Sequence, residues 1–296
     1  MRRRVRDGRR CFHKEVIMKI GILGASTMGI GLIQICAQHG FDVVYRARRQ
    51  ESVDAAYDKV LANYEFMIAN GWLTAEQRDD SMARITGSID IELLKESDFV
   101  IEAASENMQT KKELFRQLDE MCRPEVILAT NTSSLSVTEI ASVTKRDDKV
   151  IGMHFFNPAP VMKLVEMIPG YNTSQETIDF AIDMAKKLQK TPIVVTEAPG
   201  FVVNRMLVPM INEAVSVLAE GLAKAEDIDQ AMKLGANHPM GPLALADLVG
   251  LDICLSIMDV LYEEFKEPKY RANPLLRKMV RAGKLGQKTG EGFYKY

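Results

Sequence analysis

Short apolar runs alternate with longer amphipathic stretches along the first two thirds of the chain. Apolar runs typical of buried strands lie just before residue 24 and at 43–45, 99–103, 126–129, 150–155 and 193–195. The stretches 52–69 and 108–122 between them carry apolar residues at helical spacing. From Met18 to about Thr196 this order predicts a doubly wound α/β fold, a Rossmann-like parallel sheet with helices on both faces.

The strand pattern stops after Pro199-Gly200, and the rest of the chain has helical spacing. We expect helices at 201–219, 225–234, 243–265 and 274–282. The chain thus divides into a dinucleotide-binding domain at 18–198 and an all-helical domain at 199–296. Helix 243–265 is apolar around much of its circumference, so it is either central to the helical domain or part of a subunit interface. We expect a homodimer, with the helical domain serving substrate binding and dimerisation.

Composition narrows the function classes. A chain of 296 residues with 47% hydrophobic residues can build two cores. A net charge of −2 gives no reason to expect nucleic acid or an anionic membrane as a partner, and no apolar run reaches the length of a bilayer span. The four cysteines (Cys11, Cys36, Cys122 and Cys254) are far apart and include no C-x-x-C pair. This spacing suggests neither a metal site nor a disulfide framework, and it favours the reducing cytoplasm.

Residues 1–17 differ from the rest in being crowded with arginine and lacking apolar periodicity. The arginines are Arg2, Arg3, Arg4, Arg6, Arg9 and Arg10. We expect a disordered extension, most simply the product of an upstream start codon. A targeting peptide is the alternative, but the segment has no serine and contains Asp7 and Glu15.

The turn after the first strand is a candidate dinucleotide site. An apolar strand runs into a glycine turn that opens a helix, the arrangement that holds a pyrophosphate. The candidate residues are Gly24, Ser26, Thr27, Met28 and Gly29. Serine occupies the middle glycine position of G-x-G-x-x-G, so the motif by itself is weak, and a merely buried strand is the alternative.

The end of the second strand bears on the choice of cofactor. An NAD-binding domain normally offers a carboxylate to the ribose hydroxyls about twenty residues beyond the glycines. This chain has Ala47 there, flanked by Arg46, Arg48 and Arg49. A missing carboxylate beside guanidinium groups suits the 2′-phosphate of NADP. A solvated basic loop is the alternative, so the cofactor is NAD or NADP.

Candidate catalytic groups follow two later strands. The run 131–134 (NTSS) and the run 154–158 (HFFNP) both stand at carboxyl ends of strands, where open sheets bind ligands. Glu166 lies in the apolar run 164–168 (LVEMI), where a carboxylate must be paired or neutralised. An imidazole is a natural partner, and the carboxylate would orient it. The alternatives are a structural histidine and a surface carboxylate on an edge strand.

From about Met18 to Tyr296 the chain resembles the 3-hydroxyacyl-CoA dehydrogenases, and within them the bacterial 3-hydroxybutyryl-CoA dehydrogenases. The resemblance rests on the runs 24–29 (GASTMG), 101–107 (IEAASEN), 131–135 (NTSSL), 154–158 (HFFNP), 199–205 (PGFVVNR), 233–236 (KLGA), 238–242 (HPMGP) and 288–294 (KTGEGFY). It implies interconversion of (S)-3-hydroxybutyryl-CoA and acetoacetyl-CoA by hydride transfer with a nicotinamide cofactor.

The resemblance also implies roles for individual residues. His154 would be the general acid/base and Glu166 its orienting partner, the pair that the residues themselves suggested. Ser133 and Asn204 would fix the substrate oxygen and the thioester carbonyl, in a cleft between the domains. Four more residues would lie near the cofactor: Glu106, Lys111, Asn157 and Lys288.

The chain departs from the family pattern at three points. Ser26 and Ala47 replace a glycine and an aspartate, which bears on the cofactor and not on the reaction. In helix 52–70, mitochondrial members carry a serine and a lysine that meet CoA, where this chain has Asn63 and Asn70. No CoA contact is carried over to these two residues.

Two other functions compete with this interpretation. A β-hydroxyacid dehydrogenase of the 6-phosphogluconate type would use a lysine as base, which the pairing of His154 with Glu166 opposes. A non-catalytic NAD(P)- or CoA-binding scaffold would fit the altered cofactor positions. Such a scaffold has no need to keep Ser133, His154, Glu166 and Asn204 together.

Overall fold

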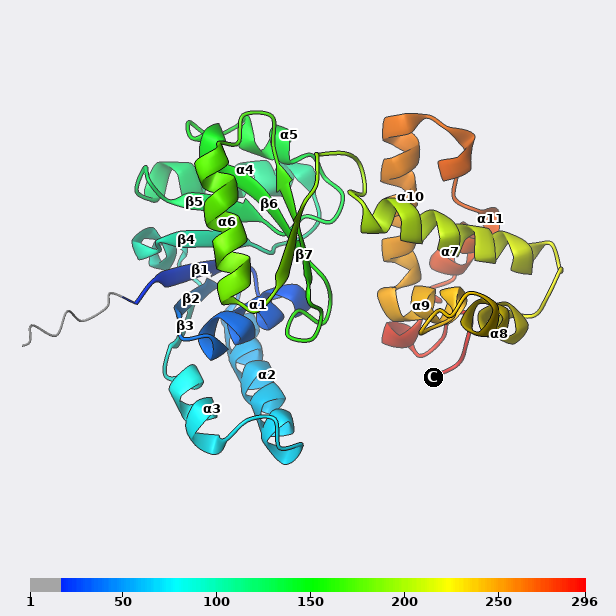
Figure 1. Ribbon diagram of the computed structural model, residues 1–296, viewed down its shortest axis with the longest axis horizontal. Coiled ribbons are helices and arrows are strands. Elements are labelled where there is room, and N and C mark those ends of the chain that lie inside the picture. Colours follow the sequence, from blue (N-terminus) through cyan, green and yellow to red (C-terminus); the bar gives the residue numbers. More distant parts are fainter. Residues whose placement is uncertain (1–16) are drawn as a thin grey trace, which may run out of the picture.

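The computed structural model describes residues 17–296, which form a sheet domain and a helical domain side by side (Figure 1). The segment between the last strand and helix α7 (Val203–Ala219) joins them. The expected extension falls almost entirely on residues 1–16, and these lie outside the described residues, as does Cys11. No helix within 17–296 has the length and apolar character needed to cross a bilayer.

Eight strands form one sheet in the order β3-β2-β1-β4-β5-β6-β7-β8. Their bounds are β1 Lys19–Leu23, β2 Asp42–Arg46, β3 Ile85–Ser88, β4 Phe99–Glu102, β5 Ile127–Thr130, β6 Val150–Phe155, β7 Leu164–Pro169 and β8 Thr191–Val194. The six strands from β3 to β6 are parallel, which confirms most of the predicted sheet. Strand β7 is antiparallel to β6, because residues 156–163 are too few for a crossover connection.

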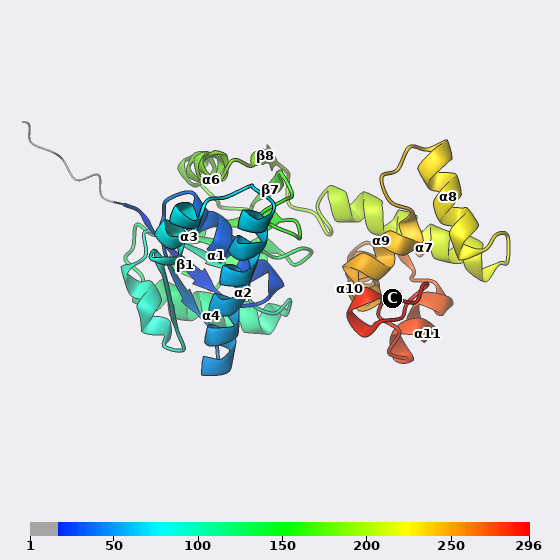
Figure 2. The same ribbon diagram turned by 90° about the horizontal axis from the view of Figure 1, so that it is seen from below.

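Helices cover both faces of the sheet (Figure 2). The helical elements of this domain are α1 Thr27–Gln38, α2 Gln50–Ala69, α3 Ala75–Met82, η1 Ile91–Glu96, α4 Met108–Met121, α5 Val137–Ala141, η2 Asp147–Lys149 and α6 Gln175–Lys187. Apolar residues of α1, α2 and α6 share one core with one face of the sheet. Those of η1, α4 and α5 share a second core with the other face. This sandwich is the doubly wound fold that the alternating pattern predicted.

The second domain is helical, with α7 Val203–Ala219, α8 Ala225–Gly235, α9 Pro242–Val249, α10 Leu251–Phe265, η3 Pro268–Tyr270, α11 Pro274–Arg281 and η4 Gln287–Thr289. The single helix expected at 243–265 is wrong, because the chain breaks at Gly250. Gly250 has a φ of 105°, and a Cβ there would lie 2.9 Å from a carboxylate oxygen of Asp252. An apolar period continues through such a break, so the pattern could not reveal it.

Helix α10 packs against α7, α9 and α11 in the core of the helical domain. Its buried side chains are Leu251, Cys254, Ile257, Met258 and Leu261. This placement agrees with the first of the two expectations for the apolar segment, a central helix. Ile253 and Tyr262 on the same helix remain exposed.

Candidate active site

The glycine turn between β1 and α1 needs its two glycines for steric reasons. Gly24 has a φ of 127°, and a Cβ on it would lie 2.5 Å from the carbonyl oxygen of Ala103. A Cβ on Gly29 would lie 2.1 Å from the carbonyl oxygen of Gly24. These contacts let the backbone of α1 approach the turn closely, as a pyrophosphate site requires.

Ser26 begins helix α1 as its N-cap. Its hydroxyl donates to the carbonyl oxygen of Ala103 at 3.0 Å and accepts from the N–H of Gly29 at 3.4 Å. The side chain is therefore engaged with β4 and with its own helix. This engagement explains how serine occupies the middle position of the motif while the turn keeps its shape. Thr27 and Met28 form the first turn of the same helix.

A cavity of about 740 Å³ lies beside this turn. Its lining comes from the glycine turn, from the end of β2 with the start of α2, and from the loop after β4. Ala47 is one lining residue, and its N–H donates to the carbonyl oxygen of Ser88. The cavity thus adjoins both features that the sequence connected with a dinucleotide.

His154 and Glu166 form a buried pair across β6 and β7. The two residues are direct partners in the antiparallel register, and Nδ1 of His154 lies 2.8 Å from Oε2 of Glu166. Glu166 is 1% exposed and His154 is 5% exposed. A carboxylate accepts only, so Nδ1 is the donor, and in a neutral imidazole Nε2 then carries the lone pair of a base.

The other oxygen of Glu166 connects the pair to the helical domain. Oε1 accepts from the N–H groups of Val202 and Val203, at 3.1 and 3.0 Å, where α7 begins. The backbone before them turns sharply, since Gly200 has a φ of 72° and Phe201 a φ of 51°. A positive φ is uncommon for phenylalanine, and such strain is typical of functional sites.

The surroundings keep Glu166 ionised. Burial acts to raise the pKa of its carboxyl group, but the hydrogen bonds from His154, Val203 and Val202 outweigh burial and hold the pKa below its usual value. The aromatic ring of Phe156 lies 4.4 Å from the imidazole, and that of Phe201 lies 5.6 Å away. Both rings are tilted relative to the imidazole, by 50° and 57°, so aromatic groups from both domains flank His154.

The loop after β5 is organised by Glu106. Oε1 of Glu106 accepts from the hydroxyl of Thr132 at 2.6 Å, and from the N–H and the hydroxyl of Ser133 at 2.8 and 3.1 Å. Partial burial acts to raise the pKa of Glu106, yet the charge of Lys111 and these hydrogen bonds lower it overall. The carboxylate therefore holds Ser133 in place.

Asn204 reaches the same loop from α7. Its amide nitrogen donates to the carbonyl oxygen of Ser133 at 3.2 Å, across the domain boundary. Together with the contacts of Glu166, this bond brings Ser133, His154, Glu166 and Asn204 to the junction of the two domains. These are the four residues that the sequence marked as catalytic.

Behind the loop lies a buried ion pair that the sequence reasoning missed. The ammonium of Lys111 is 2.8 Å from both carboxylate oxygens of Glu102, and 3.5 Å from Oε2 of Glu106. The hydroxyl of Thr130 donates to Glu102 at 2.7 Å. Glu102 ends the apolar strand 99–102 and is fully buried. The rule that drew attention to Glu166, a carboxylate in an apolar run, could have identified it.

The remaining candidates lie in different places. Asn157 is exposed in the loop after β6, next to a cis bond to Pro158. Lys288 lies in the helical domain, with its ammonium 2.5 Å from Oδ1 of Asp252. Asn63 donates to Gln34, and Asn70 donates to the carbonyl oxygen of Phe66. Neither Asn157 nor Lys288 lines the cavity beside the glycine turn, so their roles stay predictions.

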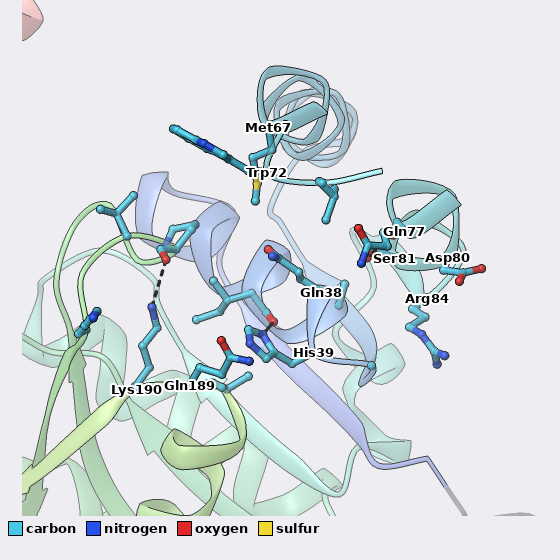
Figure 3. Close-up of a pocket in the computed structure, with 18 residues that line it drawn as sticks. Gln38, His39, Met67, Trp72, Gln77, Asp80, Ser81, Arg84, Gln189 and Lys190 are labelled. Atoms are coloured by element: carbon cyan, nitrogen blue, oxygen red, sulfur yellow. Dashed lines mark hydrogen bonds between the residues drawn. The ribbon is translucent and has the colours of Figure 1, made fainter. Parts of the chain in front are cut away.

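A second cavity, of about 560 Å³, lies between α1, α3 and the loop 156–163 (Figure 3). Lys190 points toward that loop, and its ammonium donates to the carbonyl oxygens of Ala159, Pro160 and Met162 at 2.6, 3.3 and 2.9 Å. Burial lowers the pKa of this lysine. Its partners follow the His154 run directly in sequence, so Lys190 braces the loop after the candidate base.

Metal binding has no support in the part of the chain that the structure describes. Within residues 17–296, no group of three or more His, Cys, Asp or Glu side chains converges as a metal site would require. Cys36, Cys122 and Cys254 are buried thiols without a disulfide.

Comparison with family models identifies the family of this chain. Residues 19–198 match the NAD binding domain of 3-hydroxyacyl-CoA dehydrogenase, and residues 200–296 match its C-terminal domain. The chain belongs to the 3-hydroxyacyl-CoA dehydrogenase family. It is thus an oxidoreductase, and its sheet domain is the nicotinamide-cofactor domain of that family.

Relatives of this dehydrogenase align over nearly its whole length. It is 53% identical over 280 residues to the 3-hydroxybutyryl-CoA dehydrogenase of Clostridioides difficile, covering 94% of this chain and 99% of that one. It is 42% identical to human mitochondrial hydroxyacyl-coenzyme A dehydrogenase, covering 96% and 93%. The crystal structure of (S)-3-hydroxybutyryl-CoA dehydrogenase from Ralstonia eutropha superposes with a TM-score of 0.90 at 50% identity, covering 95% and 99%.

Proposed function

We propose that this dehydrogenase interconverts (S)-3-hydroxybutyryl-CoA and acetoacetyl-CoA, with His154 as the general acid/base. The observation that carries the proposal is the His154–Glu166 pair, whose geometry directs the basic Nε2 away from the carboxylate. The names of two relatives support the substrate class, and the name of the Ralstonia eutropha enzyme supports the S-enantiomer.

In the oxidation direction, Nε2 of His154 takes the proton of the 3-hydroxyl group while hydride leaves C3. A bound nicotinamide ring, from NAD or NADP, would accept that hydride. Glu166 stabilises the imidazolium that forms and holds the ring in place. Reduction runs through the same groups, with the imidazolium returning its proton to the oxygen. Holding the base over the hydroxyl avoids the entropic cost of a bimolecular proton transfer.

Ser133 and Asn204 have the roles of positioning groups in this proposal. The hydroxyl of Ser133 and the amide of Asn204 can hold the 3-oxygen and the thioester carbonyl, and both belong to the junction that His154 faces. The glycine turn 24–29 would hold the pyrophosphate of the cofactor. Glu106 would act there by fixing the Ser133 loop, with Lys111 behind it.

The proposal divides the chain at the same boundaries as the sequence pattern. Residues 18–198 would bind the dinucleotide, and residues 199–296 would bind substrate and form a homodimer. The helical domain supports a second copy as its partner, since several of its large apolar side chains are exposed: Met206, Leu222, Leu234, Leu248 and Ile253. Sedimentation at several concentrations tests the dimer, and a single monomer-sized species would contradict it.

The cytoplasm is the proposed location of the enzyme. Its support is the wide spacing of the cysteines in the sequence, which suggests no disulfide framework of the kind common in oxidising compartments. Locating the full-length protein by cell fractionation tests this assignment. Recovery from an oxidising compartment would contradict it.

The reaction is tested by mixing the purified full chain with acetoacetyl-CoA and either NADH or NADPH. Turnover is measured as the loss of near-ultraviolet absorbance when the reduced cofactor is oxidised. In the reverse assay, (S)-3-hydroxybutyryl-CoA should be oxidised and the R-enantiomer should not. The matched variant is His154→Asn, whose amide can still donate to Glu166 but offers no base at the Nε2 position. Turnover should fall at least about a hundredfold with the circular dichroism unchanged.

Two outcomes and one structural observation separate this proposal from its competitors. No turnover with either cofactor, from a folded protein, would favour the non-catalytic scaffold. Wild-type turnover in His154→Asn would remove the histidine mechanism. A lysine base of the 6-phosphogluconate type is disfavoured, because Lys111 is bound to Glu102 and Lys190 to three backbone carbonyls.

A further inference from the structure

The cavity beside the glycine turn has an unusual charge at the end of β2. Its lining there consists of Arg46, Ala47, Arg48, Arg49 and Ser52. The whole lining includes three arginines and no carboxylate. If the turn 24–29 holds a pyrophosphate, this part of the cavity faces the adenosine ribose, because the end of the second strand carries the ribose contacts in such folds. This step rests on the proposed function.

Ala47 cannot perform the usual contact to the ribose. It is 5% exposed, and its methyl group offers no acceptor to the 2′- and 3′-hydroxyl groups. A carboxylate at this place would also repel a phosphate on the 2′-oxygen, and the alanine removes that repulsion. Glu51, the nearest acid along the chain, is exposed and does not line the cavity.

The arginines around Ala47 are available to bind an anion. Arg46 donates through Nε to the carbonyl oxygen of Ile89 at 3.2 Å, which ties its side chain to the backbone just after β3. Arg48 and Arg49 are exposed, and within residues 17–296 neither forms a salt bridge. Most other arginines of the sheet domain do form one, for example Arg78, Arg84, Arg123 and Arg146.

We propose that Arg48 and Arg49, with the hydroxyl of Ser52, form a subsite for the 2′-phosphate of NADP(H). Guanidinium groups suit a phosphate monoester because their planar N–H donors match its oxygens in pairs. Charge-assisted hydrogen bonds of this kind correspond to roughly tenfold to a hundredfold in affinity each. The subsite makes NADP(H) the preferred hydride carrier of this enzyme.

Coenzyme A carries a related group, a 3′-phosphate on its adenosine, so the test must separate the two sources. The probes are adenosine 2′,5′-bisphosphate, adenosine 3′,5′-bisphosphate and 5′-AMP, each titrated calorimetrically into the full chain. The 2′,5′-bisphosphate should bind at least about tenfold more tightly than 5′-AMP and than the 3′,5′-bisphosphate. Equal affinity for the 2′,5′-bisphosphate and 5′-AMP would overturn the proposal. Preference for the 3′,5′-bisphosphate would assign the arginines to coenzyme A instead.

Variants then assign the preference to residues. Arg48→Gln/Arg49→Gln should abolish the preference for the 2′,5′-bisphosphate and leave 5′-AMP binding within about threefold. Ala47→Asp should lower the affinity for the 2′,5′-bisphosphate by about tenfold or more through charge repulsion. Arg116→Gln is the matched control, since Arg116 is exposed on α4 and does not line the cavity. An unchanged preference in the double variant would contradict the assignment.

The two proposals can fail separately. If acetoacetyl-CoA is reduced with NADH while the 2′,5′-bisphosphate binds no more tightly than 5′-AMP, the proposed subsite is wrong and the proposed reaction stands. If the 2′,5′-bisphosphate is preferred while neither cofactor is oxidised, the subsite stands and the reaction is wrong. A ratio of NADPH to NADH turnover above about ten, lost in the double variant, supports both.

Discussion

His154 and Glu166 occupy directly opposed positions on the antiparallel strands β6 and β7, with Nδ1 and Oε2 2.8 Å apart. Because β7 is antiparallel to β6, the strand register alone places Glu166 opposite His154. Neither residue depends on a loop for its position. The second oxygen of Glu166 then accepts two N–H groups at the start of α7. A single carboxylate thus orients the imidazole and anchors the helical domain to it.

Glu166→Gln tests whether both carboxylate oxygens are needed, one to orient His154 and the other to accept from the start of α7. Glutamine has one oxygen and one NH₂ group, so it cannot accept from the α7 backbone and from Nδ1–H at the same time. If its NH₂ group faces His154, the imidazole must shift its proton to Nε2 and the base is lost. We expect turnover to fall by about 10²- to 10⁴-fold, with KM for acetoacetyl-CoA changed far less.

The pH profile supplies the check on that result. A loss of kcat with the same pH dependence as wild type would mean that Glu166 only supports the fold. A changed profile, with circular dichroism and chain dimensions preserved, is the expected outcome. Glu176→Gln is the control, since Glu176 lies in the first turn of α6 and takes no part in the junction.

Ser26→Gly should restore the full glycine motif without improving cofactor binding. The hydroxyl is directed at the carbonyl oxygen of Ala103, so its loss affects the N-cap by only a few tenths of a kcal/mol and one hydrogen bond by about 1 kcal/mol. NADPH affinity, measured by fluorescence titration, should stay within about threefold. Gly29→Ala should weaken it more than tenfold, because the new Cβ would meet the carbonyl oxygen of Gly24. Tenfold tighter binding in Ser26→Gly would show that serine obstructs the phosphate.

Much of the sheet domain could be predicted because its cause is local. Buried parallel strands need continuous apolar runs, and their covering helices need amphipathic ones, so β6 Val150–Phe155 matches its predicted bounds. The antiparallel direction of β7 was missed because the run 164–168 was not among the predicted strands, although the short connection 156–163 allows only an antiparallel return. The helix break at Gly250 was not predicted either. A single glycine within an apolar helical pattern is often tolerated, so only its φ reveals the break.

The candidate site was likewise predictable only where a side chain carries a signal in the sequence. Glu166 and His154 could be paired from sequence because a buried charge demands a partner. The N–H groups of Val202 and Val203 could not, since backbone donors carry no side-chain signature. Lys111 could be connected with the cofactor only by resemblance, and its contacts with Glu102 and Glu106 needed coordinates.

Glu102→Gln should destabilise the enzyme strongly. Its carboxylate and the ammonium of Lys111 are 0% and 1% exposed, and removing one charge leaves the other buried without its partner. Breaking such a pair costs about 3–5 kcal/mol of unfolding free energy. Urea denaturation measures this cost, with Glu96→Gln, at an exposed glutamate before β4, as the control.

The double variant Glu102→Gln/Lys111→Met should recover most of that loss, because neither member of the buried pair is then charged. It should not recover activity to the same extent, since Lys111 also faces Glu106, which holds Ser133. Recovery of stability and activity together would mean that the pair acts on the fold alone. Failure to recover stability would show that packing, and not charge, makes Glu102 necessary.

Acid should destabilise the enzyme partly through Glu106, whose pKa is lowered in the folded state from an ordinary value of 4.5. Because the folded carboxyl binds its proton less readily than the unfolded one, its stabilising contribution is complete above about pH 4.5 and is lost as pH falls through the lower folded pKa. Glu106→Gln should therefore reduce the unfolding free energy near neutral pH more than near pH 3, as measured by urea denaturation at each pH. Glu113→Gln, on the exposed side of α4, is the control. A loss equal at both pH values would mean that Glu106 acts through hydrogen-bond geometry and not through its charge, since glutamine lacks only the charge and one acceptor.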